Sequence, residues 1–182
     1  MKKHRNKLIL AAFALQILLL LSIAGLVFCV SRNGRTAVLE MTGYDPYDAL
    51  RGRYLQMSNP DGDVVLEPGS VQRYQARSGE PGDVYVVLEP DPENGLDRFS
   101  FATLDRPARD VPYIKCASGY LWMSGDEARV YIYPRITKYY LNESQAARLE
   151  GAVTWDTQIR LSLKIWRGMY VADGLEIDGV KY

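Results

Sequence analysis

The chain has 182 residues, with 22 basic and 22 acidic side chains and therefore no formal net charge. These charges are unevenly placed, because four basic residues precede an apolar run at residues 8–30 that carries no charge. Residues 31–182 then hold the other 18 basic residues against 22 acidic ones, a net charge of −4. A mildly acidic segment gives no electrostatic basis for binding nucleic acid, so we expect no nucleic-acid partner.

Residues 8–30 are predicted to cross a lipid bilayer as one helix. Such a helix rises about 1.5 Å per residue, so the run matches the roughly 30 Å hydrocarbon core. A cleaved secretion signal would be shorter and would end in small residues, whereas this run ends in bulky ones. Basic residues are concentrated in residues 1–7, which the positive-inside rule places in the cytoplasm as a basic flank. We expect a single-pass signal anchor in the cell membrane, with the lipid bilayer as a partner and the rest of the chain outside the cytoplasm.

The remainder is predicted to form a linker at residues 31–36 and one β-rich domain at residues 37–182. Short β-rich runs alternate with turn-forming residues, as in antiparallel strands joined by hairpins. The clearest strand is residues 158–166, where Ile159, Leu161, Leu163 and Ile165 alternate with polar residues and predict one buried face. The other clear runs are 84–90, 99–104, 111–116 and 129–134, and the turn signals lie at 59–63, 78–83, 91–95, 124–126, 172–174 and 178–179.

One short helix is predicted in this domain, near residues 143–157. Asn142 can cap its first turn, and Gln145 stands three residues later as in a capping box. Residues 169–182 predict a final hairpin. The expected fold is therefore a single N-terminal transmembrane helix followed by one mainly antiparallel β (α+β) extracytoplasmic domain.

The single histidine and the two cysteines restrict the possible chemistry. His4 precedes the apolar run and so lies across the membrane from the folded domain, which excludes histidine-dependent nucleophiles and zinc sites there. Cys29 lies at the end of the run and Cys116 is alone in the domain, so an intradomain disulfide is impossible. We expect Cys116 to be a buried apolar side chain, and the sequence indicates neither a cofactor nor a metal site.

All 13 tyrosines lie beyond the apolar run. Tyr131 and Tyr133 fall on the same face of a predicted strand, and Tyr139 and Tyr140 immediately precede the predicted helix. We expect these rings to be packing groups whose hydroxyls reach a partner or water, with a sugar-binding or peptide-binding platform as the alternative.

The stretch DPYDALRGRYLQM, residues 45–57, has the highest density of charged and aromatic side chains. Asp45 and its following proline predict a turn, and Gly52 a bend into a strand in which Tyr54 and Gln56 share one face. Arg51 is expected to pair with a nearby carboxylate, Asp45 or Asp48, in a structural elbow.

Three segments, taken in order, resemble a bacterial family of membrane-anchored proteins named for its G-D-Y-x-x-L-x-Y signature. The matching residues are Asp45-Pro46, Asp48 and Leu50-Arg51-Gly52-Tyr54, then Tyr139 to Glu143 with Leu149-Glu150, and finally Gly174 to Gly179. The first two segments supply the candidate functional residues, which are Asp45, Asp48, Arg51, Gly52 and Tyr54 in one and Tyr139, Tyr140 and Glu143 in the other.

The signature is degenerate in this chain, because Arg53 stands where the family has aspartate, Met57 where it has leucine and Asn59 where it has the final tyrosine. An arginine would invert the charge of a base or metal ligand at that position. The resemblance implies no reaction, since the family has no established activity.

Members of the family that this chain resembles tend to be encoded beside multi-spanning membrane proteins, and the resemblance therefore implies a partner in the membrane. We expect a non-catalytic envelope protein that acts as a binding or assembly partner of such a protein. The alternative is an envelope hydrolase or transferase that uses the carboxylates of Asp45, Asp48 and Glu143, with Arg51 binding an anionic substrate.

Overall fold

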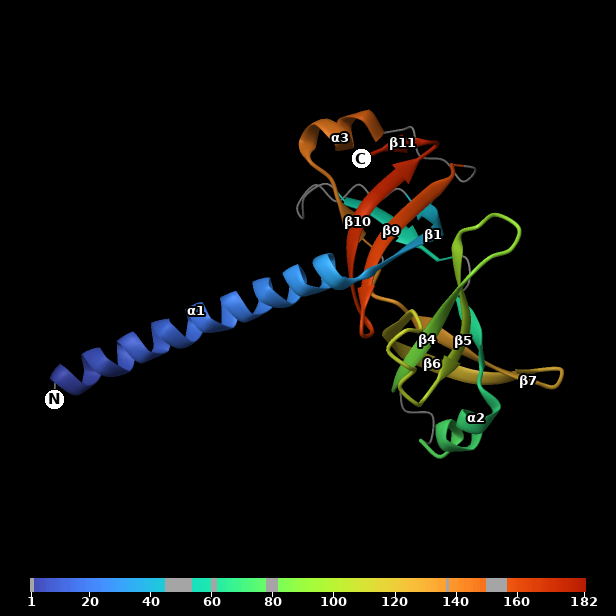
Figure 1. Ribbon diagram of the computed structural model, residues 1–182, viewed down its shortest axis with the longest axis horizontal. Coiled ribbons are helices and arrows are strands. Elements are labelled where there is room, and N and C mark those ends of the chain that lie inside the picture. The colour runs from blue at the N-terminus through green and yellow to red at the C-terminus, as the bar shows by residue number, and fades with distance from the viewer. Residues whose placement is uncertain (1, 45–53, 60–61, 78–81, 137, 150–156) are drawn as a thin grey trace.

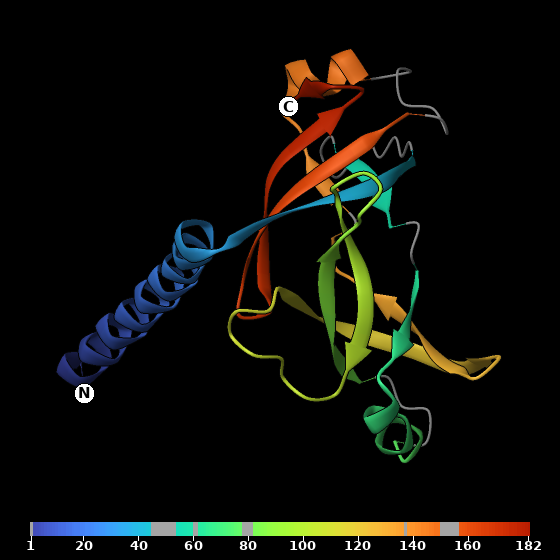
Figure 2. The same cartoon turned by 45° about the vertical axis from the view of Figure 1, so that its right-hand side comes forward.

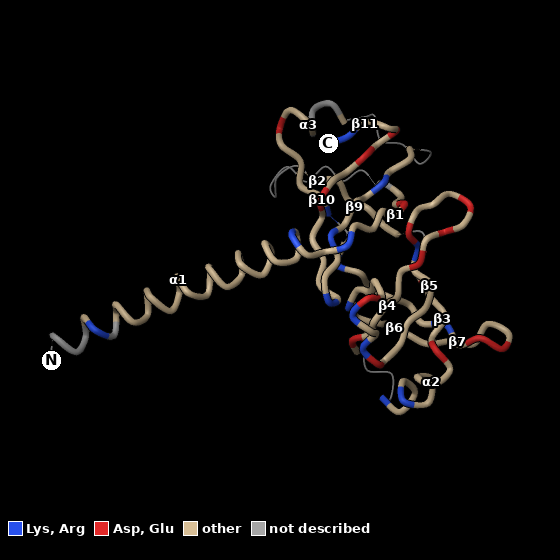
Figure 3. Tube along the Cα trace, in the orientation of Figure 1, with Lys and Arg blue, Asp and Glu red and all other residues tan. Residues whose placement is uncertain are grey.

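A long N-terminal helix leads directly into a β-rich domain, as the computed structural model in Figure 1 shows. The structure describes residues 2–44, 54–59, 62–77, 82–136, 138–149 and 157–182. Helix α1 (Lys2–Asn33) carries no charged side chain between Lys7 and Arg32, which Figure 3 shows as an unbroken tan coil. Its segment Ile9–Asn33 is long and apolar enough to cross a membrane, and its side chains are almost all exposed. The expected apolar helix and β-rich domain are both confirmed.

The junction between α1 and the domain is short and tightly packed. Strand β1 (Arg35–Tyr44) begins two residues after α1 ends, so the segment expected as a linker is regular structure apart from Gly34. The Gly34 amide donates to the Val30 carbonyl at 2.8 Å, and the Val30 side chain is fully buried. A Cβ atom on Gly34 would lie 2.5 Å from the Val30 oxygen and 3.0 Å from the Ile165 nitrogen. Only glycine therefore allows the helix to end against the sheet in this way.

Gly34→Ala should loosen this junction and destabilise the domain by about 1–3 kcal/mol, because the added methyl group overpacks a contact made of backbone atoms. Trypsin cleavage at Arg32 and Arg35 in detergent-solubilised protein should become faster. Gly25→Ala in the same helix is the matched control, because its Cβ would meet nothing within 4 Å. Equal cleavage rates in the two variants would contradict the tight junction.

The strands form an open sheet and a small barrel that share a boundary (Figures 1 and 2). The open sheet is antiparallel and has the order β8-β2-β1-β9-β10-β11. Around the barrel the order is β3-β5-β4-β6-β7, and β7 pairs with β3 to close it. Leu39 of β1 pairs with Asp97 of β5 and joins the two parts. The bounds are β2 (Tyr54–Ser58), β3 (Asp63–Leu66), β4 (Asp83–Pro90), β5 (Asp97–Thr103), β6 (Tyr113–Ser124), β7 (Glu127–Tyr133), β8 (Lys138–Tyr140), β9 (Ile159–Trp166), β10 (Met169–Ile177) and β11 (Val180–Lys181).

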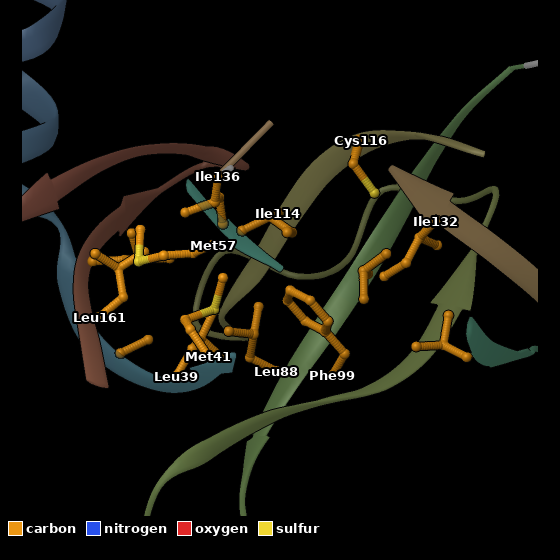
Figure 4. Close-up of a cluster of buried hydrophobic side chains, with 14 of the residues drawn as sticks. Leu39, Met41, Met57, Leu88, Phe99, Ile114, Cys116, Ile132, Ile136 and Leu161 are labelled. Carbon is orange, nitrogen blue, oxygen red and sulfur yellow. The ribbon is translucent and has the colours of Figure 1, made fainter. Parts of the chain in front are cut away.

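A single hydrophobic core runs from the sheet into the barrel. In Figure 4 Leu39, Met57 and Leu161 of the sheet lie in one cluster with Leu88, Phe99 and Ile132 of the barrel. The alternation predicted for residues 158–166 is confirmed, because Ile159, Leu161, Leu163 and Ile165 of β9 are all buried. The strand around Tyr54 follows the same pattern, with Leu55 and Met57 buried.

Two local expectations were wrong. The turn expected at residues 172–174 is a bulge within β10, because this strand keeps pairing with β9 on both sides of it. The real turn is Arg167-Gly168, where both residues have positive φ, as hairpin turns of type I′ require. The prediction of one helix in the domain also missed α2 (Pro68–Gln75), which begins with a proline in its first turn.

Helix α3 (Glu143–Leu149) confirms the helix expected near residues 143–157, of which residues 150–156 lie outside the described residues. The predicted capping box is present. The Gln145 amide donates to Asn142 Oδ1 at 2.8 Å, and the Asn142 amide donates to Gln145 Oε1 at 3.2 Å. The cap fixes where the chain turns after β8.

Candidate functional site: the β2–β8 strand pair

The two candidate segments meet in space. Tyr54 opens β2 and pairs with Tyr140, the last residue of β8, and Leu55 pairs with Tyr139. Asp45, Asp48, Arg51 and Gly52 lie outside the described residues, as does Arg53. The structure therefore places Tyr54 beside the second segment but does not test the expected Arg51 ion pair or a carboxylate cluster.

Alternation along the two strands separates an inner from an outer face. Leu55 is buried, and Tyr139 packs against the hydrophobic core. Tyr54, Gln56, Lys138 and Tyr140 share the opposite face, and the Tyr140 side chain is 70% exposed. We call these four residues the outer ribbon face.

Lys138 was not among the residues singled out from the sequence, yet it lies at the centre of this face. Its Nζ atom is 4.3 Å from the centroid of the Tyr54 ring, a cation–π contact. The Tyr54 and Tyr140 rings lie 6.0 Å apart and are tilted by 58°. Two aromatic rings and a cation thus form one surface, which can contact both an apolar group and an anionic one.

Glu143 lies beyond this surface, in the first turn of α3, and its side chain is exposed. A carboxylate there is favourable for the helix, because the free amides of the first turn carry partial positive charge. This position gives Glu143 a structural role at the start of α3.

Strand β8 has an open edge. It contains three residues and pairs only with β2 among the strands that the structure describes. Open edges are points at which another chain can add main-chain hydrogen bonds. The outer ribbon face therefore adjoins a backbone edge that can take part in the same contact.

A comparison with known protein families shows to which family the chain belongs. The model of the family described as GDYXXLXY protein matches residues 16–175. The chain belongs to the GDYXXLXY family. No curated protein and no solved structure matches it.

In this GDYXXLXY protein, the signature tyrosine Tyr54 and the tyrosine pair near α3 therefore belong to one strand pair. Met57, which replaces the signature leucine, is 1% exposed and occupies the core as leucine would. The replacement conserves volume and polarity, so it leaves the inner face of β2 unchanged.

Cys116 is buried, as expected. Burial raises the pKa of its thiol from 9.0 to about 12, and the Asp83 carboxylate adds to the shift. The thiol is thus protonated at neutral pH and is a poor nucleophile. Among the described residues, no group of three or more His, Cys, Asp or Glu side chains is placed to hold a metal ion.

The raised pKa of the Cys116 thiol predicts that the free energy of unfolding decreases at alkaline pH. The folded state keeps the Cys116 proton up to about pH 12, whereas the unfolded state loses it above about pH 9. Stability should therefore decrease by about 1.4 kcal/mol per pH unit between these values through this group alone. The check is the difference in urea unfolding between the Cys29→Ser protein and the same protein with Cys116→Ala added. A difference that stays constant from pH 8 to about pH 11 would contradict the assignment.

A cavity of about 250 Å³ lies between β1 and the turn that joins β4 to β5, lined partly by Glu40, Asp91, Asn94 and Asp97. Two of its acidic side chains, Asp97 and Asp91, have structural partners. Asp97 accepts a hydrogen bond from the Val38 amide at 2.9 Å, and Asp91 accepts one from the Glu93 amide at 2.9 Å. We assign these groups to holding β1 against the barrel and to closing the turn.

Proposed function

We propose that the protein is a membrane-anchored, non-catalytic binding or assembly partner of another membrane protein. In this proposal α1 crosses the cell membrane with its N-terminus in the cytoplasm, and the β-rich domain lies outside. The outer ribbon face contacts the partner. Its two tyrosine rings supply apolar area, and Lys138 supplies a cation for an acidic group on that partner.

The observation that carries the proposal is the pairing of the two family segments in β2 and β8. Their inner residues pack in the core or against it, whereas Tyr140 on the outer face is 70% exposed and contacts the Tyr54 ring only from one side. The short junction at Gly34 supports the same assignment, because it packs the end of α1 against β9 of the open sheet that also contains this face. A partner in the membrane can then contact α1 and the ribbon together.

Cross-linking and co-purification from native membranes in a mild detergent test the proposal. The wild-type chain should retain one recurrent membrane protein, and the double variant Lys138→Ala/Tyr140→Ala should retain at least tenfold less of it. Tyr120→Ala is the matched control, because it removes a similarly exposed tyrosine from the barrel. A wild-type protein that always purifies alone, or equal loss in both variants, would contradict the proposal.

A further inference from the structure

A second aromatic surface lies on the barrel, on the outer side of the β6–β7 hairpin. Tyr120 and Tyr131 have ring centroids 5.7 Å apart and planes within 12° of parallel. Trp122 lies 5.2 Å from Tyr120, and Tyr133 lies 5.0 Å from Tyr131. Tyr120 is 64% and Tyr133 50% exposed, so these rings are not merely packing groups. We call the four rings the barrel platform.

The backbone beneath the platform is shaped to hold it. A Cβ atom on Gly62 would lie 3.0 Å from the Tyr131 ring, and one on Gly119 would lie 2.9 Å from the Tyr133 ring. A shift in register between Ser118 and Leu121 places Tyr120 in an irregular part of β6. The Tyr74 hydroxyl from α2 donates to the Gly119 carbonyl at 2.6 Å and fixes this irregularity. The rings are therefore preorganised before any ligand arrives.

The barrel has the strand pairing of an OB-fold whose chain begins at a different strand. In an OB-fold the first strand pairs with the second and the fourth, the third pairs with the second and, in parallel, the fifth, and the fourth pairs with the fifth. Strands β6, β7, β3, β4 and β5 pair in this way when taken as first to fifth, and β3 and β5 are parallel. Helix α2 lies between β3 and β4, where an OB-fold has its helix. The platform lies on the first and second of these strands, and it includes the second strand of the face on which OB-folds bind oligonucleotides or oligosaccharides.

Charge distinguishes between these two ligands. Arg129, which pairs with Trp122 across the two strands, carries a positive charge that neighbouring carboxylates neutralise. Its Nε atom lies 2.5 Å from Asp63 Oδ2, and its Nη1 atom lies 3.8 Å from Glu127 Oε2. The β6–β7 turn carries Asp126 and Glu127, and Figure 3 shows acidic residues at its tip. A phosphate backbone would be repelled here, whereas the hydroxyls of a sugar can donate to these carboxylates.

We propose that the barrel platform binds an uncharged oligosaccharide chain, whose sugar rings lie against Tyr120, Trp122, Tyr131 and Tyr133 while the acidic β6–β7 turn accepts hydrogen bonds from its hydroxyls. The hairpin points away from α1 in both views (Figures 1 and 2). The platform is thus separate from the β2–β8 pair, and the two surfaces can bind different partners.

The test uses the full chain in a polyoxyethylene ether detergent, because sugar-based detergents would compete for the platform. Chitopentaose, cellopentaose and maltopentaose are titrated by calorimetry. At least one should bind saturably, with at least tenfold weaker binding by Tyr120→Ala and Trp122→Ala and unchanged binding by Tyr140→Ala. Tyr120→Phe should bind as the wild type does, because it keeps the ring. Tyr120→Ala removes a mostly exposed side chain, so its unfolding temperature should match that of the wild type.

Three results would overturn the proposal. One is the absence of saturable binding by all three oligosaccharides. Another is equal loss of binding in Tyr120→Ala and Tyr140→Ala, which would move the site away from the barrel. The third is salt-sensitive binding of an oligo-dT strand without binding of any oligosaccharide, which would indicate a nucleic-acid surface. Co-purification with a membrane protein is unaffected by these outcomes, so the two proposals fail independently.

Discussion

Leu161→Ala is expected to destabilise the β-rich domain by about 2–5 kcal/mol, the usual cost of removing a buried leucine side chain beyond Cβ. Leu161 is the third residue of β9 and is fully buried. It pairs with Leu39 of β1 on one side and with Leu175 of β10 on the other, and both are at most 2% exposed. Three strands therefore lose contacts together, and a rigid β-sheet can close little of the cavity.

Urea unfolding of the full chain, followed by tryptophan fluorescence, measures this loss. Ser162→Ala is the matched control, because Ser162 is the next residue in the same strand and lies on the opposite face. We expect the control to change stability by less than about 0.5 kcal/mol. Similar losses in the two variants would show that β9 does not bury its leucine face as the structure has it.

The helices and strands that were predicted correctly are those whose residue pattern along the chain is enough to specify them. Strand β9 was clear because its apolar residues alternate, and the cap of α3 was clear because Asn142 and Gln145 have the capping-box spacing. The Ala172-Asp173-Gly174 segment misled because the same residues suit a turn or a bulge. The segment is a bulge because β10 pairs with β9 on both sides of it. The sequence of the segment alone does not show that pairing.

The candidate site could be predicted only in part, because strand pairing cannot be read from the sequence around each residue. Tyr54, Tyr139 and Tyr140 were found from the family segments, but their pairing joins strands that no single hairpin connects. Lys138 gains its role only from this register, which places its ammonium group over the Tyr54 ring. Its sequence neighbours give no sign of that contact. The barrel platform was found only in part, since Tyr131 and Tyr133 were singled out from the sequence but Tyr120 and Trp122 were not. Tyr120 reaches Tyr131 only across the β6–β7 pairing.

The turn that joins β9 to β10 gives the second large effect. Gly168 has φ of +83°, and a Cβ atom there would lie 2.7 Å from Cε2 of the buried Tyr113 ring. The ring cannot readily move, because its hydroxyl accepts a hydrogen bond from Arg106 Nε at 2.8 Å. The Gly168 carbonyl also accepts from the Lys115 amide at 3.0 Å and holds the hairpin against β6. Gly168→Ala should therefore cost about 2–4 kcal/mol, from left-handed strain plus overpacking.

Gly179→Ala separates these two causes. Gly179 has φ of +82° in the turn between β10 and β11, but a Cβ atom there would meet nothing within 4 Å. Its replacement should cost only the backbone strain, about 1 kcal/mol. The difference between the two variants in urea unfolding then measures the contact of the turn with Tyr113. If the two losses are equal, the β9–β10 turn does not pack against β6, and the open sheet and the barrel are joined less tightly than the shared core requires.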